Sequence, residues 1–164
     1  MKAIILWGRA NTGKTTTLNL VIQNLLSLGA TVEHDCKGNR VADRCLVLKY
    51  NGHRIAVCTD GDCESIVQRN FNDLKLAGAT YDIFVGASRS RGASCNCIES
   101  QFSAPNDQIL WYRISNVYGP NFSDPFLKTK IYPLAQKHQA DCIMDLIHTC
   151  LLYTSPSPRD PKTS

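Results

Sequence analysis

Residues 8–17 read GRANTGKTTT, and this stretch limits the possible folds of the chain more than any other feature. Ahead of it, residues 2–7 (KAIILW) form a short apolar run that is typical of a buried strand. Behind it, leucine, valine and isoleucine recur at helical spacing as far as Gly29, which predicts an amphipathic helix that ends at this glycine. The sequence therefore predicts a strand, a tight loop and a helix in direct succession.

The loop carries the residue types that bind phosphate groups. Its glycines allow the backbone to curl so that successive N–H groups converge on an anion, at the positive end of the helix dipole. A lysine at this position neutralises the terminal phosphates, and the following hydroxyl is a ligand for Mg²⁺. The residues expected around the phosphates are Gly8, Arg9, Ala10, Asn11, Thr12, Gly13, Lys14, Thr15 and Thr16. The sequence thus predicts a nucleotide-binding site.

Composition excludes several other classes of protein. The length of 164 residues favours one domain, and the net charge of +4 is scattered, without the basic stripe of a nucleic-acid-binding protein. We find no apolar run long enough to cross a membrane and no signal peptide, because Met1 and Lys2 lead directly into the first strand. We therefore expect a cytoplasmic protein whose partner is a nucleoside triphosphate, with no nucleic acid and no membrane.

The eight cysteines do not have the spacing of a metal site. Zinc sites favour paired C-x-x-C motifs, and the pair Cys95 and Cys97 has one residue too few between its members. We expect reduced thiols, with Cys58 and Cys142 as small core residues.

The rest of the chain alternates between strand and helix patterns. Two β-rich runs, 44–50 and 53–59, flank Asn51-Gly52, which is a strong hairpin signal. The other expected elements are a short strand at 30–33, a helix at 64–77, a strand at 81–86, a short helix at 96–102, a strand at 108–114, a loop at 119–130 and a last helix whose first turn holds Pro133. This order predicts a three-layer α/β/α sandwich whose mostly parallel sheet has the hairpin as an antiparallel edge.

With these motifs, residues 1–149 resemble the P-loop NTPase superfamily. GRANTGKT matches its Walker A pattern, and residues 55–60 (IAVCTD) resemble its Walker B strand. The resemblance implies the P-loop NTPase fold, catalysis by positioning and charge neutralisation with Lys14, and Mg²⁺ held by Thr15 and Asp60. We expect Asp60 near the Thr15 hydroxyl. Asp62 stands at the start of the next helix, where an N-cap is expected, with the positioning of a water as a second possible role.

The resemblance also bears on the nucleotide and the reaction. After the strand at 81–86 the chain reads Ala-Ser-Arg-Ser where GTP-binding members carry Asn-Lys-x-Asp, which favours ATP over GTP. We expect the chain to hydrolyse ATP. The alternatives are a small-molecule kinase, with a substrate-binding acid at Glu33 or Asp35 and a lid bearing Arg89 and Arg91, a GTP-binding switch, and a non-catalytic nucleotide-binding module. In the loaded state we expect Arg89 or Arg91 to turn toward the γ-phosphate.

The C-terminal residues have a different character. Residues 150–160, CLLYTSPSPRD, resemble the translation of a sequencing-library adapter, which implies that residues 150–164 are foreign to the natural protein. The alternative is a natural disordered tail. Prolines among serine, threonine and charged residues do not extend a helix or build a core. We therefore expect a folded domain over 1–149 and a disordered tail over 150–164.

Overall fold

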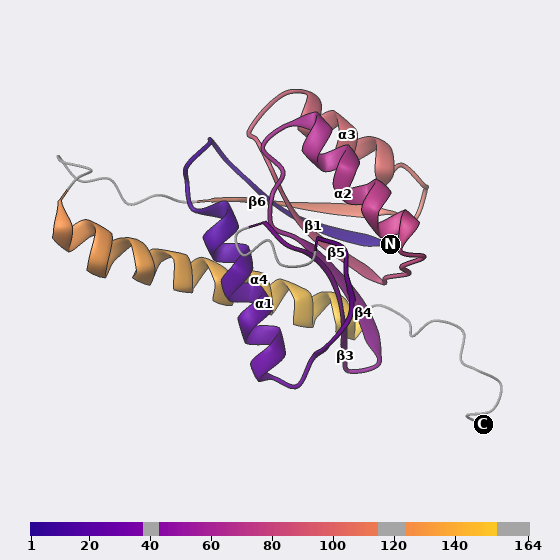
Figure 1. Ribbon diagram of the computed structural model, residues 1–164, viewed down its shortest axis with the longest axis horizontal. Helices are drawn as coiled ribbons and strands as arrows, with labels where there is room; N and C mark the ends of the chain where they lie inside the picture. The colour runs from indigo at the N-terminus through magenta and orange to yellow at the C-terminus, as the bar shows by residue number, and fades with distance from the viewer. Residues whose placement is uncertain (38–42, 115–123, 154–164) are drawn as a thin grey trace.

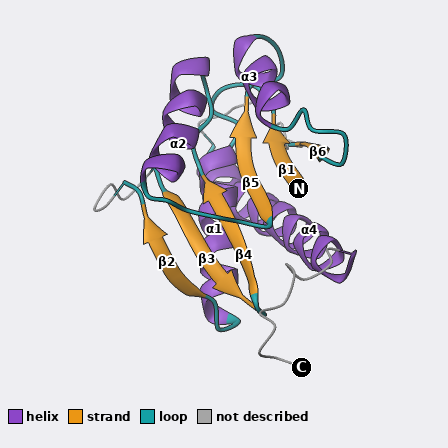
Figure 2. Cartoon of the chain, turned by 90° about the vertical axis from the view of Figure 1, so that its right-hand side faces the viewer, coloured by secondary structure: helices purple, strands orange, loops and turns teal. Residues whose placement is uncertain are grey.

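The computed structural model describes residues 1–37, 43–114 and 124–153 of the chain. Within these residues one six-stranded sheet has the order β2-β3-β4-β5-β1-β6 (Figure 2). Its strands are β1 (Lys2–Trp7), β2 (Thr31–Asp35), β3 (Cys45–Tyr50), β4 (His53–Cys58), β5 (Ile83–Ser88) and β6 (Gln108–Arg113). β1 pairs in parallel with β5 and β6, and β4 pairs in parallel with β5. The α/β class and the mostly parallel sheet are therefore confirmed.

The antiparallel strand is not at the edge of the sheet, where we had expected it. β3 is antiparallel to both β2 and β4, and β2 adds outside it as the edge strand. The hairpin between β3 and β4 is confirmed, with φ of 49° at Asn51 and 77° at Gly52, as a tight hairpin turn requires. The Asn-Gly signal thus predicts the turn, but it does not predict which strand pairs on the far side of the hairpin.

A pair of helices covers each face of the sheet (Figure 1). The helices are α1 (Lys14–Ser27), α2 (Glu64–Leu76), α3 (Ala93–Gln101) and α4 (Tyr132–Tyr153). Ile4 and Leu6 of β1 belong to the core shared with α1 and α4, whereas Ala3 and Ile5 belong to the core shared with α2 and α3. Because successive side chains of a strand point to opposite faces, a strand buried on both faces must be apolar throughout. This requirement explains the continuous apolar run in β1.

The last helical segment begins earlier than the sequence pattern predicts. Helical turns start at Pro125, and a π-helical segment, η1 (Leu127–Ile131), leads directly into α4. The Asp124 carboxylate accepts a hydrogen bond of 2.8 Å from the N–H of Phe126 at this start. The expected loop at 119–130 is therefore wrong for residues 125–130, while 119–123 lie outside the described residues. Pro133 is the second residue of α4, so its expected place in the first turn of the last helix is confirmed, and η1 precedes this turn directly.

The C-terminal boundary of the folded domain is also different. α4 continues to Tyr153, and the Cys150 side chain is buried in the core with 5% exposure. Residues 150–153 therefore belong to the folded domain, in contrast to our expectation, and residues 154–164 lie outside the described part. Cys142 is exposed on α4, so its expected place in the core is wrong, whereas Cys58 is buried. None of the described helices combines the length and apolar character needed to cross a membrane.

Candidate functional site

The predicted phosphate-binding loop lies between β1 and α1, at the carboxyl end of a parallel strand. The Gly8 N–H donates to the Ser88 carbonyl of β5 over 3.2 Å, which holds the start of the loop against the neighbouring strand. Gly13 has a φ of 85°, a left-handed conformation that favours glycine, and it precedes α1 directly. Within the described residues no side chain caps α1, and its first turn has no acid. The first backbone N–H groups of α1 therefore form an anion-attracting helix end.

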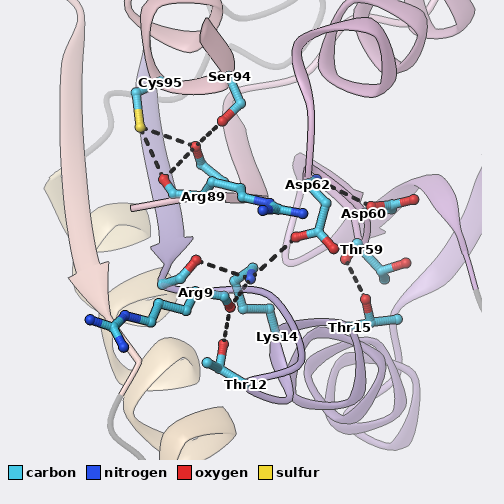
Figure 3. Close-up of polar contacts among 12 residues, drawn as sticks. Arg9, Thr12, Lys14, Thr15, Thr59, Asp60, Asp62, Arg89, Ser94 and Cys95 are labelled. Carbon is cyan, nitrogen blue, oxygen red and sulfur yellow. Dashed lines mark hydrogen bonds and ion pairs between the residues drawn. The ribbon is translucent and has the colours of Figure 1, made fainter. Parts of the chain in front are cut away.

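The Lys14 amine is enclosed by the loop. Its side chain is 5% exposed, and Nζ donates to the Gly8 carbonyl over 3.2 Å and to the Arg9 carbonyl over 2.7 Å (Figure 3). The third neighbour is Asp62, whose Oδ1 lies 3.3 Å from Nζ. A buried ammonium is tolerated where hydrogen bonds and an opposite charge compensate for lost water, and here two carbonyls accept hydrogen bonds while the Asp62 carboxylate forms an ion pair. The charge of Lys14 is thus held at the centre of the loop.

Thr15 connects α1 to the end of β4, although β5 lies between β1 and β4 in the sheet. The Thr15 hydroxyl donates to the carbonyl of Thr59 over 3.2 Å. No hydrogen bond joins Thr15 to the Asp60 side chain among the described residues. Oδ1 of Asp60 instead accepts the N–H of Asp62 over 3.3 Å, and the Asp60 carbonyl accepts the side-chain amide of Asn70 over 2.7 Å. Asp60 thus stabilises the conformation of residues 59–63 between β4 and α2, which we call the acidic loop.

Asp62 is the acid that faces the phosphate-binding loop. The expected N-cap role is wrong, because the N-cap of α2 is Cys63 and the Asp62 carboxylate points to Lys14 (Figure 3). Gly61 makes this course of the chain possible. A Cβ at Gly61 would lie 1.8 Å from the Ala87 carbonyl oxygen, so a larger residue does not fit where the acidic loop crosses the end of β5. The crossing brings Asp62 toward Lys14.

Asn70 is a site residue that the sequence analysis missed. Its side chain is 2% exposed and donates to the Asp60 carbonyl. The sequence could have indicated a buried role for Asn70, because it lies on the apolar face of α2 beside Val67, Phe71 and Leu74. A polar side chain in such a stripe needs a partner, and here the partner is the acidic loop.

The oxygen donors fit a magnesium ion that shares its shell with phosphate groups. Within the described residues no cluster of three or more histidine, cysteine, aspartate or glutamate side chains could hold a metal by itself. Mg²⁺ does not require such a cluster, because it is usually bound by one or two carboxylates together with substrate phosphates and water. Thr15 donates its hydroxyl proton to Thr59, which leaves its oxygen lone pairs for a cation, and Asp62 supplies a carboxylate nearby.

Arg89 and Arg91 lie on different sides of the loop. The Arg89 carbonyl accepts hydrogen bonds from the Ser88 hydroxyl and the Cys95 thiol over 3.1 and 3.0 Å, and its side chain extends toward the side of Asp62 (Figure 3). Arg91 lines a cavity next to β6. The sequence analysis had placed both residues in one lid, but β5 extends through Ser88 and only a short turn remains before α3.

Glu33, one of the two acids expected to bind a kinase substrate, already has a partner. Oε2 of Glu33 accepts a hydrogen bond of 2.6 Å from Nε of Arg54, which lowers the pKa of Glu33. This pair joins β2 to β4 on the exposed surface, so Glu33 is engaged in holding the edge strand. The structure gives no support to Glu33 as a substrate-binding acid.

The cysteines are all free thiols. Sγ atoms of Cys45 and Cys58 lie 3.0 Å apart on opposite strands of the hairpin, and burial raises the pKa of the Cys58 thiol. Cys63 at the start of α2 is exposed, and hydrogen bonds from Ser65 and the Ile66 backbone lower its pKa.

The site is therefore built from the loop after β1, the first turn of α1 and the acidic loop after β4, all at the carboxyl edge of the sheet. Comparison with known proteins adds no family to this description. No protein-family model, no curated protein and no solved structure matches the chain.

Proposed function

We propose that this chain binds Mg²⁺–ATP on residues 8–16 and hydrolyses it, as a P-loop NTPase. One observation carries the proposal. The buried Lys14 amine and the uncapped N-terminus of α1 are placed at the carboxyl end of β1, on a loop that satisfies G-x-x-x-x-G-K-[ST]. Open α/β sheets bind their ligands at this edge, and helix N-termini bind phosphate groups. The P-loop NTPase fold is part of the proposal, supported by the parallel strands β5 and β6 on either side of β1.

The residues have distinct roles in this proposal. The N–H groups at the start of α1 hold phosphate oxygens, and Lys14 neutralises the negative charge that develops on them. A bound Mg²⁺ would add positive charge at the same oxygens, held by the Thr15 hydroxyl and a carboxylate. We assign that carboxylate to Asp62, because it is the acid that faces Lys14, and we assign Asp60 to the shape of the acidic loop.

ATP is favoured over GTP by the end of β5. Guanine-reading members of the superfamily that this chain resembles carry Asn-Lys-x-Asp after the corresponding strand, whereas residues 87–90 here are Ala-Ser-Arg-Ser. Both Ala87 and Ser88 are buried within β5. No carboxylate is therefore present at this point to pair with the guanine edge.

Thermal unfolding in the presence of nucleotides tests the proposal. At a hundred times its Kd, Mg²⁺–ATP should stabilise the chain by about 2.7 kcal/mol. Lys14→Ala should remove this stabilisation, because the variant lacks the charge that faces the phosphates. Lys75→Ala, which changes an exposed lysine on α2, is the matched control and should behave like the parent chain. Each variant is compared with itself without nucleotide, so a change in its intrinsic stability does not affect the result.

Two further readouts separate the alternatives. GTP and the two diphosphates are measured in the same way, with and without Mg²⁺, and ATP should give the largest shift. Release of inorganic phosphate over many turnovers distinguishes a hydrolase from a binding module, and release that requires an added acceptor indicates a kinase. An equal Mg²⁺–ATP shift in Lys14→Ala and the parent chain would show that nucleotide binds elsewhere or not at all.

A further inference from the structure

Three cysteines lie together in the part of the core that the sheet shares with α2. Cys45 on β3 and Cys58 on β4 belong to this core and are 0% and 1% exposed. Cys36, which directly follows β2, packs against the same core and is only partly buried, and its thiol is within hydrogen-bonding reach of Cys45. A row of thiols therefore leads from the surface at Cys36 to the interior at Cys58. The proposed nucleotide site uses none of these side chains.

Cys45 and Cys58 are directly opposite each other on the hairpin of β3 and β4, with their Sγ atoms 3.0 Å apart. The neighbouring pair is hydrogen-bonded, because Thr59 donates its N–H to the Arg44 carbonyl over 2.9 Å. The Cys45 carbonyl instead accepts the Cys36 N–H over 2.9 Å, on the side of β2. Cys45 and Cys58 are thus a non-hydrogen-bonded pair, whose Cα atoms are expected about 4.5 Å apart, within the roughly 4.4–6.8 Å that a disulfide spans. A bond between them requires no change of strand register.

The surroundings of the two thiols are not those of inert core cysteines. Nζ of Lys37 is buried and has no hydrogen-bond partner among the described residues, although a buried ammonium needs a compensating group. A hydrogen bond from the Cys58 thiol and the charge of Lys37 lower the pKa of Cys45, whereas burial raises the pKa of Cys58. Cys45 is therefore the thiol that ionises, and Cys58 stays protonated beside it as a hydrogen-bond donor.

We propose that Cys45 and Cys58 form a peroxide-reactive dithiol that closes into a disulfide, with Lys37 stabilising the attacking thiolate. The Cys45 thiolate attacks one oxygen of hydrogen peroxide and breaks the O–O bond, which leaves a sulfenic acid on Cys45 and a hydroxide that takes up the proton lost from Cys45. The Cys58 sulfur then attacks Sγ of Cys45, and the sulfenic oxygen leaves as water with the proton of Cys58. Two thiols are oxidised by two electrons, and the peroxide is reduced to two waters. This reaction goes beyond the proposed nucleotide chemistry and does not depend on it.

Peptide mapping after peroxide treatment tests the proposal, because tryptic cleavage separates the three thiols. Cys36 falls in peptide 15–37, Cys45 in 45–49 and Cys58 in 55–69. Cys63 shares the last peptide, so the full chain with Cys63→Ser serves as the parent. The folded parent is treated with hydrogen peroxide, and the remaining thiols are alkylated in denaturant before digestion. We expect a cross-link between peptides 45–49 and 55–69 that a reducing agent breaks. In urea the cross-links should spread over several cysteine pairs, because the hairpin no longer holds Cys45 against Cys58.

The rate of cross-linking tests the role of Lys37. Lys37→Gln should slow it by about fivefold, because less of Cys45 is present as the thiolate, and Lys37→Arg should restore it. Lys75→Gln, at an exposed lysine on α2, is the matched control and should react like the parent. An unchanged rate in Lys37→Gln would overturn the role of Lys37.

Two results would overturn the dithiol itself. One is a folded chain that keeps Cys45 and Cys58 as free thiols while peroxide oxidises the exposed Cys142. The other is a dominant cross-link that joins Cys36 to either of them. Lys14→Ala should form the same cross-link as the parent, so the dithiol and the nucleotide site are tested separately.

Discussion

Lys14 illustrates how a charged side chain is made tolerable inside a fold. An ammonium group carries three protons, and burial without acceptors would cost several kcal/mol. Two carbonyls of the loop itself accept hydrogen bonds from the ammonium group, and Asp62, which comes from a separate loop, adds an ion pair. The loop can therefore be formed by local sequence, whereas the full environment of the lysine depends on the chain after β4.

The first prediction at this scale compares the two acids. Asp62→Asn should weaken Mg²⁺-dependent ATP binding by about tenfold, because it removes the carboxylate that faces Lys14 and the proposed metal. Asp60→Asn should have a smaller effect, because an amide oxygen can still accept the N–H of Asp62. Titration of ATP at several Mg²⁺ concentrations measures both. A larger loss of ATP binding in Asp60→Asn than in Asp62→Asn would indicate that Asp60 holds the metal, and it would contradict our assignment.

At the scale of elements, the crossing of the acidic loop over β5 positions the site. Gly61 contacts the Ala87 carbonyl so closely that there is no space for a side chain. Any larger residue must push the acidic loop away from β5, and with it Asp62 away from Lys14. The strand order therefore makes a glycine at this position necessary for the site as well as for packing.

Gly61→Ala should lower the free energy of unfolding by about 1–3 kcal/mol, the usual cost of overpacking, and should also weaken Mg²⁺–ATP binding. Gly52→Ala is the comparison. It strains the left-handed turn by about 1 kcal/mol but has open space around it, so nucleotide binding should not change. Urea denaturation and the ATP titration are measured on both variants. Normal ATP binding in a folded Gly61→Ala variant would show that the crossing is not needed for the site.

Several elements were predictable because their signals are local. The periodicity of Leu18, Val21, Ile22 and Leu25 predicts α1, and Asn51-Gly52 predicts the hairpin turn. The direction of the Asp60 and Asp62 carboxylates was not predictable, because it depends on contact of Gly61 with a strand distant in sequence. The separation of Arg89 from Arg91 was not predictable either, because β5 extends to Ser88 and leaves a shorter turn than the sequence pattern suggested. Asn70 has no local signal beyond its polarity on an apolar face.

At the scale of the whole molecule, the end of α4 completes the core against β1. Cys150 is buried with the same cluster that contains Ile4, Leu6 and Ile147, and Leu151 packs partly against it. The resemblance to adapter sequence therefore includes residues that the domain uses for packing. Composition alone did not show this, because CLLY is compatible with a buried helix end as well as with a tail.

A chain that ends at Thr149 should be less stable than one that ends at Tyr153, by about 1–2 kcal/mol, because it loses the burial of Cys150 and part of Leu151. Both chains lack residues 154–164, so the difference reports the four helical residues only. Thermal or urea unfolding measures it, with the Mg²⁺–ATP shift as a control that should be the same in both. Equal stability would mean that these side chains contribute little to the core.

The separation of β1 from β4 also has a consequence for how this sequence can change with time. With β5 between them, the two strands lie about 10 Å apart, from the usual spacing of neighbouring strands. Residues 59–62 act as a tether of fixed length across this gap, and one inserted residue would move Asp62 by up to about 3.5 Å. Evolutionary insertions and deletions should therefore be excluded from this tether while they remain acceptable at the exposed hairpin tip formed by Asn51 and Gly52.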